Sequence, residues 1–194
     1  TATDTGVGKT EVTCALLRDA RARGLDAVGM KPAQSGTVPG EPSDAERLAQ
    51  ASDGAEPLEI VCPYSLAAPL APAVAARPGG REISFADILH GPRALAPRHD
   101  LVLVEGAGGL LVPLTARETF ADLAVALGLP VLVVARAGLG TVNHTALTVE
   151  ALRRRGLGIA GIVMNRTSPD DDPSVRHNAG EIARLTGIAP AALL

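Results

Sequence analysis

The sequence predicts an α/β protein with an open, mostly parallel sheet flanked by helices. Four short apolar runs, at residues 27–31, 101–104, 131–135 and 159–164, are typical of buried strands. Between them lie stretches with helical character, which parallel strands need as crossover connections. A glycine-rich turn ending in Gly-Lys-Thr precedes the first of these stretches, which is typical of a phosphate site at a helix N-terminus.

Six helices are expected along the chain. The first covers residues 10–23 and ends at Gly24, because glycine is common just after a helix. The second begins at Ser43, with Glu46 three residues later, which is the spacing of a capping box. The full set of expected helices is 10–23, 43–51, 84–95, 120–127, 141–155 and 174–185.

Residues 62–82 are rich in Pro, Ala and Gly, and we expect them to cross the surface rather than to link two domains. Residues 1–194 are therefore interpreted as a single domain. A phosphate-binding loop normally follows a buried strand, and nothing precedes Thr1. We therefore expect a missing N-terminal strand, and also further residues beyond Leu194.

The composition indicates an ordinary soluble globular protein. Apolar residues make up 46% of the chain, charged residues 20%, and the net charge is −3. The arginines are dispersed, so no nucleic-acid surface is expected. The longest apolar run, 123–135, is short and contains Gly128 and Pro130, so no membrane span is expected. Cys14 and Cys62 are expected to be buried small residues in a reducing compartment, the cytoplasm.

The lysines are few. The 18 cationic residues include only two Lys, at positions 9 and 31, and the rest are Arg. Since Lys is a compact point charge that Arg does not replace at a phosphate, both lysines are candidates for function. Chance remains the alternative for Lys31.

The turn at residues 6–10, Gly-Val-Gly-Lys-Thr, predicts a phosphate-binding loop. Its backbone N–H groups and the following helix would attract phosphate, Lys9 would reach the outer phosphates, and Thr10 could bind Mg²⁺. The usual pattern has glycine where this chain has Thr3, and the residue before it is Ala2. Alanine is tolerable there unless its φ is positive.

Two further strands end in charged residues. Glu105 follows the strand at 101–104 and could bind Mg²⁺ directly or through water, although a strand-end acid facing solvent is the alternative. Lys31 ends the strand at 27–31, at the same edge, so both lysines are expected to converge on one site. Ser35 lies four residues farther on, in a turn.

Three weaker features remain open. Asp44 lies in the first turn of a helix, where acidic residues are common because they stabilise the helix N-terminus. On this feature alone, a structural role for Asp44 is preferred over a functional one. The glycine turn at 137–145 could bind a substrate carboxylate or could simply cap a helix at Thr141. Asn165 ends the last strand, where an amide could contact a purine edge.

Taken together and in chain order, these motifs resemble those of the dethiobiotin synthetases. The matching segments are T-D-T-G-V-G-K-T (3–10), K-P-A-Q-S-G (31–36), S-D-A (43–45), V-E-G-A-G-G (104–109), T-F-A-D (119–122), L-G-T-V-N-H (139–144) and V-M-N (163–165). The resemblance implies a P-loop NTPase-like fold. It also implies a loop whose outer glycine lies one residue earlier than usual, at position 2, where this chain has Ala.

The resemblance implies a ligase of biotin biosynthesis that uses ATP and Mg²⁺ to carboxylate 7,8-diaminononanoate with CO₂ and close the ring. Lys9 and Lys31 would be catalytic, and Thr10, Asp44 and Glu105 would bind the metal. The implied ATP-binding residues are Gly6, Val7, Gly8, Lys9, Thr10, Glu11, Asp44, Glu105, Gly106, Ala107, Gly108, Asn165 and Arg166. The implied substrate-binding residues are Ser35, Gly140, Thr141, Val142 and Asn143, the last four supplied across a homodimer interface.

Three rival functions fit the sequence less well. A partition-type or metal-insertion switch ATPase acting on protein partners would carry an extra lysine early in the loop, where this chain has residues 2–4, Ala-Thr-Asp. A glutamine-amidotransferring ligase would need a second domain that this chain is too short to hold. A pure nucleotide-binding module would not require Lys31.

Overall fold

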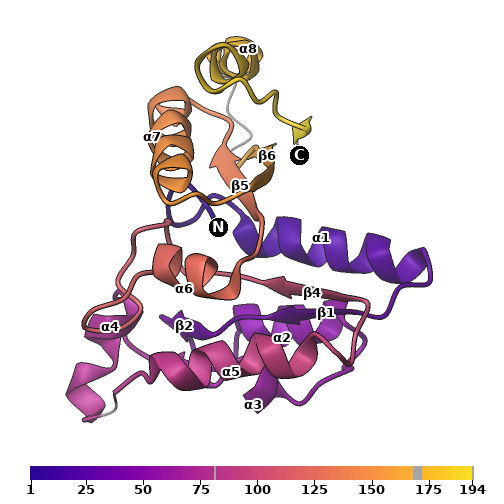
Figure 1. Ribbon diagram of the computed structural model, residues 1–194, viewed down its shortest axis with the longest axis vertical. Coiled ribbons are helices and arrows are strands. Elements are labelled where there is room, and N and C mark those ends of the chain that lie inside the picture. Colours follow the sequence, from indigo (N-terminus) through magenta and orange to yellow (C-terminus); the bar gives the residue numbers. More distant parts are fainter. Residues whose placement is uncertain (81, 168–171, 194) are drawn as a thin grey trace. The chain divides into compact units, whose positions relative to one another are not determined.

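The computed structural model describes residues 1–80, 82–167 and 172–193 (Figure 1). The chain forms two compact units, described separately below. Unit 1 comprises Thr1–Lys9, Gly108–Leu110 and Ala124–Leu194, and unit 2 comprises Thr10–Ala107 and Leu111–Leu123. The single-domain interpretation stays a prediction.

Unit 2 contains most of the helices and two short parallel ladders. Strand β1 pairs with β4, and β2 pairs with β3. The elements are α1 (Lys9–Ala22, beginning at the last residue of unit 1), β1 (Ala27–Met30), β2 (Ala33–Ser35), α2 (Asp44–Ala51), α3 (Leu58–Val61), β3 (Tyr64–Leu66), α4 (Pro72–Ala75), η1 (Arg77–Gly79), α5 (Phe85–Leu95), β4 (Leu101–Val104) and the first half of α6 (Phe120–Leu127).

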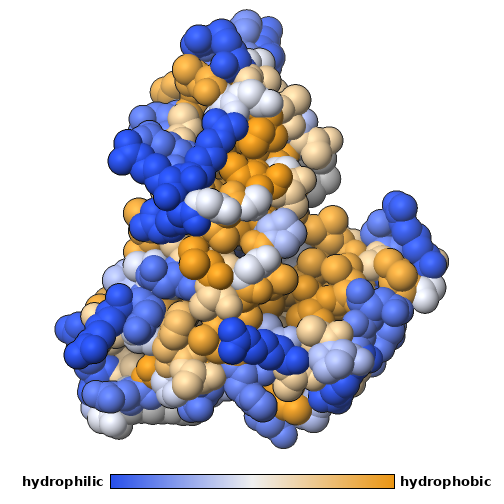
Figure 2. All heavy atoms as spheres, in the orientation of Figure 1, coloured by the Kyte–Doolittle hydropathy of each residue, from blue (hydrophilic) through white to orange (hydrophobic). Residues whose placement is uncertain are grey.

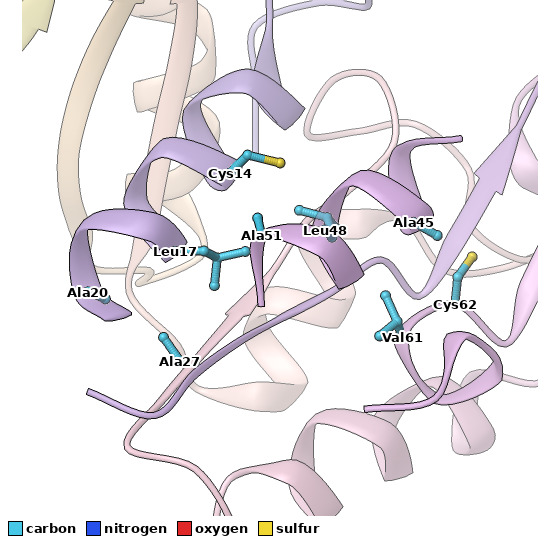
Figure 3. Close-up of a cluster of buried hydrophobic side chains, with 9 residues drawn as sticks. All are labelled: Cys14, Leu17, Ala20, Ala27, Ala45, Leu48, Ala51, Val61 and Cys62. Carbon is cyan, nitrogen blue, oxygen red and sulfur yellow. The ribbon is translucent and has the colours of Figure 1, made fainter. Parts of the chain in front are cut away.

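The alternation of strand β1 places helices on both of its faces. Ala27 faces α1 and α2, and Leu17 and Leu48 from these helices share its buried cluster (Figure 3). Val28 and Met30 point the other way, toward α5 and its Leu95. Unit 2 is therefore layered, with helices on the two sides of the β1–β4 ladder.

Two glycines make the layers of unit 2 fit closely. A Cβ on Gly29 would lie 2.8 Å from a methyl carbon of Leu17, and a Cβ on Gly91 would lie 2.2 Å from Cε of Met30. Neither glycine has a positive φ, so each is required for space rather than for backbone conformation. These close approaches hold α1 and α5 tightly against β1.

Unit 1 is built on a parallel ladder of three strands, β5 (Val131–Arg136), β6 (Ile159–Asn165) and β7 (Ala192–Leu193). Helices α7 (Thr141–Arg154) and α8 (Val175–Thr186) belong to the same unit. The start of the chain adds to this ladder, because Ala2 bridges Val134 in parallel and Thr3 N donates to the Val134 carbonyl at 3.0 Å. The segment before the glycine loop is thus extended and paired.

Most predicted elements are confirmed with end shifts of at most one residue. The capping box at Ser43 and Glu46 is present, and α6 has the predicted bounds. The prediction for residues 62–82 is wrong in part, because this segment contains β3 and α4 and buries Cys62, Tyr64 and Leu66. A strand of three residues, such as β3, carries too little periodicity to be recognised in a sequence.

The burial of Cys14 and Cys62 is also as predicted. No helix in the part of the chain that the structure describes is long and apolar enough to cross a bilayer. Apolar side chains are nevertheless exposed in places: Figure 2 shows apolar surface over α1, where Leu16 is exposed.

Candidate functional site

Four side chains of unit 2 form a hydrogen-bonded cluster, hereafter the Lys31 cluster. The ammonium group of Lys31 lies 2.5 Å from Oδ2 of Asp44 and 2.7 Å from Oε1 of Glu105. The hydroxyl of Thr10 donates to the same Glu105 oxygen at 2.7 Å. One lysine therefore bridges two carboxylates, and one carboxylate also accepts from a threonine.

The fold explains why these residues meet. Met30 and Val104 are paired in the parallel β1–β4 ladder, so Lys31 and Glu105, which follow them, emerge at the same edge. The amide of Glu105 donates to the Met30 carbonyl at 2.7 Å, and that of Lys31 to the Val61 carbonyl at 2.8 Å. Thr10 and Asp44 belong to the first turns of helices α1 and α2.

The cluster is an electrostatic unit in low-dielectric surroundings. Lys31 and Glu105 are each only 3% exposed. Burial opposes the charge on Lys31, but the attraction of Glu105 and Asp44 outweighs it and raises the pKa of the ammonium group above its ordinary value. Burial likewise opposes the charge on Asp44, but the proximity of Lys31 lowers the pKa of this carboxyl. Lys31 is therefore held as a cation and Asp44 as an anion.

The same residues still have an oxygen atom available to coordinate a hard cation. Among the described residues, Oε2 of Glu105 is buried and has no hydrogen-bond partner. The described side chains form no group of three or more His, Cys, Asp or Glu ligands. Magnesium does not need such a cage, because it commonly takes one or two carboxylates together with phosphate oxygens and water. Two carboxylates, one of them with an unsatisfied oxygen, and a hydroxyl fit that mode.

Residues 6–9 of the glycine loop belong to unit 1, and their conformation requires the two glycines. Gly6 and Gly8 have φ values of +70° and +86°. The side-chain amide of Asn165, at the end of β6, donates to the Val7 carbonyl at 3.0 Å and so holds the loop. A Cβ on Gly8 would lie 1.8 Å from Nδ2 of Asn165, so the loop and Asn165 are closely fitted.

Three predictions concern the surroundings of this loop, for Ala2, Lys9 and Asn165. The φ of Ala2 is not positive, so the condition for tolerating alanine there is met. Lys9 is 8% exposed, and its ammonium group lies 3.4 Å from the Asp4 carbonyl. The predicted contact of Asn165 with adenine stays a prediction, since the structure shows its amide on the loop backbone.

The remaining predicted ATP-site residues have varied surroundings. Glu11 is exposed and forms an ion pair with Arg47 of α2. Gly106 packs against Phe120, where a Cβ would lie 3.2 Å from the ring, and Gly108 has a φ of +63°. Ala107 is half-buried and Arg166 is exposed. Ser35 is half-buried and is the last residue of strand β2, so the prediction that it lies in a turn is wrong.

The turn before α7 has no side-chain cap, but side chains from other parts of unit 1 form hydrogen bonds with its backbone. Gly140 is the N-cap, with a φ of +89° and no side-chain hydrogen bond to the first turn. Asp172 accepts from the Leu139 amide at 2.8 Å, and Asn178 donates to the Ala137 carbonyl at 2.7 Å. Within the helix start, Thr141 is buried, Val142 is half-buried and Asn143 is exposed. The segment that leads into α7 is therefore held by hydrogen bonds to Asp172 and Asn178.

Comparison with known proteins identifies the family. The chain is 77% identical over all 194 residues, 87% of the relative's length, to a protein of Anaeromyxobacter sp. (strain K) named ATP-dependent dethiobiotin synthetase BioD. It is 45% identical over 190 residues, covering 97% of this chain and 81% of the relative, to the protein of the same name from Rhodococcus jostii (strain RHA1). The chain belongs to the ATP-dependent dethiobiotin synthetase family.

The broader family model and solved structures agree on the fold. A model described as an AAA domain matches residues 1–192. The cell division ATPase MinD of Pyrococcus furiosus has a TM-score of 0.58 at 15% identity, over 99% of this chain and 81% of that one. A ParA family ATPase of Chlorobium tepidum TLS has a TM-score of 0.55 at 13% identity, over 100% and 82%. At such identities the likeness concerns the fold alone.

Within this dethiobiotin synthetase family member, sequence reasoning left two contacts unassigned. Gln34, inside the segment K-P-A-Q-S-G, is buried and hydrogen-bonded to the start of α2. Arg47 joins α2 to α1 through Glu11. The signal for Gln34 was its position three residues after Lys31, but a polar residue in a short strand does not reveal its partner.

Proposed function

We propose that this protein catalyses the ATP-dependent conversion of 7,8-diaminononanoate and CO₂ to dethiobiotin, ADP and phosphate. The observation that carries the proposal is the 77% identity over all 194 residues to a protein of that name. The geometry agrees with it, because Lys31, the second of only two lysines, lies in a buried carboxylate cluster rather than at the surface.

The reaction joins anions, so the protein must reduce their repulsion. One amine of the diamine attacks CO₂, a C–N bond forms, and loss of a proton gives a carbamate. A carbamate oxygen then attacks the γ-phosphorus of ATP and ADP leaves. The second amine attacks the activated carbonyl, loses a proton and expels phosphate as the cyclic urea closes. We assign Lys31 and Lys9 to the stabilisation of the carbamate and of the transferring phosphoryl group.

Lys31 is suited to this role by its environment. Its charge is maintained by Asp44 and Glu105, while burial keeps water away from the ammonium group. A cation in low-dielectric surroundings interacts more strongly with developing negative charge than one in water. The carboxylates also restrict the lysine rotamer, so little ordering is needed during the reaction.

We assign Thr10, Asp44 and Glu105 as the residues that would hold Mg²⁺, since their oxygen donors and the unsatisfied Oε2 of Glu105 suit this ion. When bound, Mg²⁺ would neutralise phosphate charge and polarise the phosphoryl group. The rest of the ATP site in this proposal consists of Gly6, Val7, Gly8, Lys9, Glu11, Gly106, Ala107, Gly108, Asn165 and Arg166.

For substrate binding, we propose that the protein acts as a homodimer in the cytoplasm. Ser35 would contact the diamine, and the first turn of α7 would receive the substrate carboxylate on the partner subunit. Support comes from Gly140, whose lack of a side chain leaves the N–H groups of that turn without an N-cap hydrogen bond. The residues assigned are Gly140, Thr141, Val142 and Asn143.

The product tests this function directly. The purified protein should be incubated with 7,8-diaminononanoate, ATP, Mg²⁺ and isotopically labelled bicarbonate, and dethiobiotin analysed by mass spectrometry. We expect the label in the ureido carbon of dethiobiotin, and no labelled product when ATP is omitted. Absence of labelled dethiobiotin from folded, ATP-binding protein would contradict the proposal.

A further inference from the structure

We infer that Gln34 is a positioning residue that fixes Asp44 for metal binding by clamping the first turn of α2. The inference rests on the proposed function, in which Asp44 helps to hold Mg²⁺. The observation behind it is that Gln34 is 5% exposed, and both ends of its side-chain amide are hydrogen-bonded.

The first contact lies at the start of the helix. Oε1 of Gln34 accepts from the backbone N–H of Ala45 at 3.0 Å. The capping box of α2 satisfies other groups, because Ser43 accepts from the Glu46 amide and Glu46 accepts from the Ser43 amide. The Ala45 amide is one of the helix N–H groups that have no partner inside the helix. A side chain distant in sequence therefore completes this turn.

The second contact anchors Gln34 itself. Its Nε2 donates to Oγ of Ser65 at 3.0 Å, and the two residues are paired in the β2–β3 ladder. Gln34 therefore cannot rotate freely, and its acceptor oxygen stays aimed at α2. The side-chain amide of Gln34 therefore links the β2–β3 ladder to the helix turn that contains Asp44.

One short segment, residues 31–34, thus contains Lys31 and also holds the helix turn that contains Asp44. Lys31 stands three residues before Gln34, and Asp44 stands one residue before the amide that Gln34 accepts from. The ion pair is short, at 2.5 Å, and its Asp44 side chain is 42% exposed, so packing alone does not fix it. Loss of the clamp would let the first turn of α2 fray and move this carboxylate.

The other end of α2 offers a matched control. Oγ of Ser52 accepts from the Gly29 amide at 3.0 Å and donates to the Leu48 carbonyl at 2.8 Å. Ser52 is buried, as Gln34 is, and it also joins α2 to the strand region. Because α2 has 8 residues, Ser52 lies about 12 Å along the helix from Asp44. Ser52→Ala should weaken the fold without touching the clamp.

The experiment compares Gln34→Met, Ser65→Ala, Ser52→Ala and Asp44→Asn in the full chain. Amide hydrogen exchange at Ala45 and Gly29 is measured by NMR without metal. Mn²⁺ affinity is measured by electron paramagnetic resonance with a saturating non-hydrolysable ATP analogue. Thermal unfolding is recorded for each variant. Met is chosen because it keeps the length of Gln but has no donor for Ser65 and only a weak sulfur acceptor in place of the amide oxygen.

We expect Gln34→Met to accelerate exchange at Ala45 by about tenfold or more, and Ser52→Ala to do so at Gly29 instead. Mn²⁺ affinity should fall about fivefold in Gln34→Met, less in Ser65→Ala, and by under about twofold in Ser52→Ala. Asp44→Asn should reduce it most. This pattern would separate positioning from general destabilisation.

Three results would overturn the inference, and they can be told apart. If Asp44→Asn weakens Mn²⁺ binding and Gln34→Met does not, or if Ser52→Ala weakens it equally, the clamp is wrong and the metal assignment stands. If Asp44→Asn leaves Mn²⁺ affinity unchanged, Asp44 does not hold the metal. That part of the proposed function and the inference then fail together.

Discussion

The ammonium group of Lys31 lies 2.7 Å from Oε1 of Glu105, and both side chains are almost fully buried. A buried carboxylate without a cation is costly, so each charge depends on the other for its stability. Asp44 adds a second carboxylate on the same ammonium group. This relationship makes Lys31 important for folding as well as for the chemistry proposed above.

Replacing Lys31 with Ala should abolish most turnover while ATP binding largely survives. In the proposed mechanism Lys31 acts on the reacting groups, and the glycine loop makes most of the contacts to ATP. We expect turnover to fall by about a hundredfold or more, measured as phosphate release at saturating substrates. An equal loss of turnover and ATP affinity would instead make Lys31 an ATP-holding or structural residue.

Magnesium should stabilise Lys31→Ala more than it stabilises the unchanged protein. Removal of one partner from a buried pair costs about 3–5 kcal/mol, because Glu105 is left with an uncompensated charge. A divalent cation can replace that charge, and binding to the folded state raises the melting temperature. Differential scanning calorimetry of both proteins, with and without Mg²⁺ in buffer that contains no Ca²⁺, measures this effect. Identical shifts in both proteins would argue against the metal assignment.

Gly8→Ala should weaken ATP binding more than Gly6→Ala. Both residues have positive φ, so each substitution costs roughly 1–2 kcal/mol in backbone strain. Only at position 8 would the new Cβ meet Asn165, at 1.8 Å, whereas position 6 has no neighbouring atom within 4 Å. Calorimetric titration with a non-hydrolysable ATP analogue should show at least about tenfold weaker binding for Gly8→Ala than for Gly6→Ala. Equal affinities would show that the Asn165 contact is readily displaced.

Acid should remove part of the stability contributed by Asp26. The ring of His99 lies between Asp26 and the buried Glu56, with contacts of 2.9 and 2.8 Å. The hydrogen bond from His99 lowers the pKa of Asp26. Because the folded-state pKa is depressed, this stability is complete above the unfolded pKa of about 3.9 and is lost as the pH falls through the folded value.

Urea unfolding of the unchanged protein and Asp26→Asn tests this. The difference in unfolding free energy between them should shrink as the pH falls below about 4, the region of the unfolded pKa of aspartate. A difference that stays the same down to about pH 3 would contradict the assignment to Asp26.

Cys62 should react slowly with alkylating reagents in the folded protein. Burial raises the pKa of its thiol to about 11, so little thiolate exists at neutral pH. Burial also raises the pKa of the Cys14 thiol. Mass spectrometry after iodoacetamide treatment at about pH 8 should show little modification of either residue, and complete modification after unfolding in urea. Rapid modification of Cys62 in the folded protein would show that its surroundings open.

The sequence predicted the larger elements because their signals are local. Ser43 and Glu46 form a capping box that can be recognised from three-residue spacing, and apolar runs predicted β1, β4, β5 and β6. Lys31 and Glu105 could be placed at one edge because parallel strands end together. These inferences needed only periodicity and connection rules.

Other features depended on contacts between distant segments. Strands β2 and β3 are three residues each, too short to show alternation, and their pairing joins Gln34 to Ser65. The donation from Asn165 to the Val7 carbonyl links residues 158 positions apart. No local pattern records such partners, so the clamp on α2 and the support of the glycine loop could be found only in the structure.

Phosphate release from ATP, measured with the diamine and bicarbonate added separately and together, tests whether a carbamate formed from both is the nucleophile toward ATP. We predict rapid phosphate release only when Mg²⁺, 7,8-diaminononanoate and bicarbonate are all present, because the carbamate is the nucleophile toward the γ-phosphate. Phosphate release at the same rate without the diamine would contradict it.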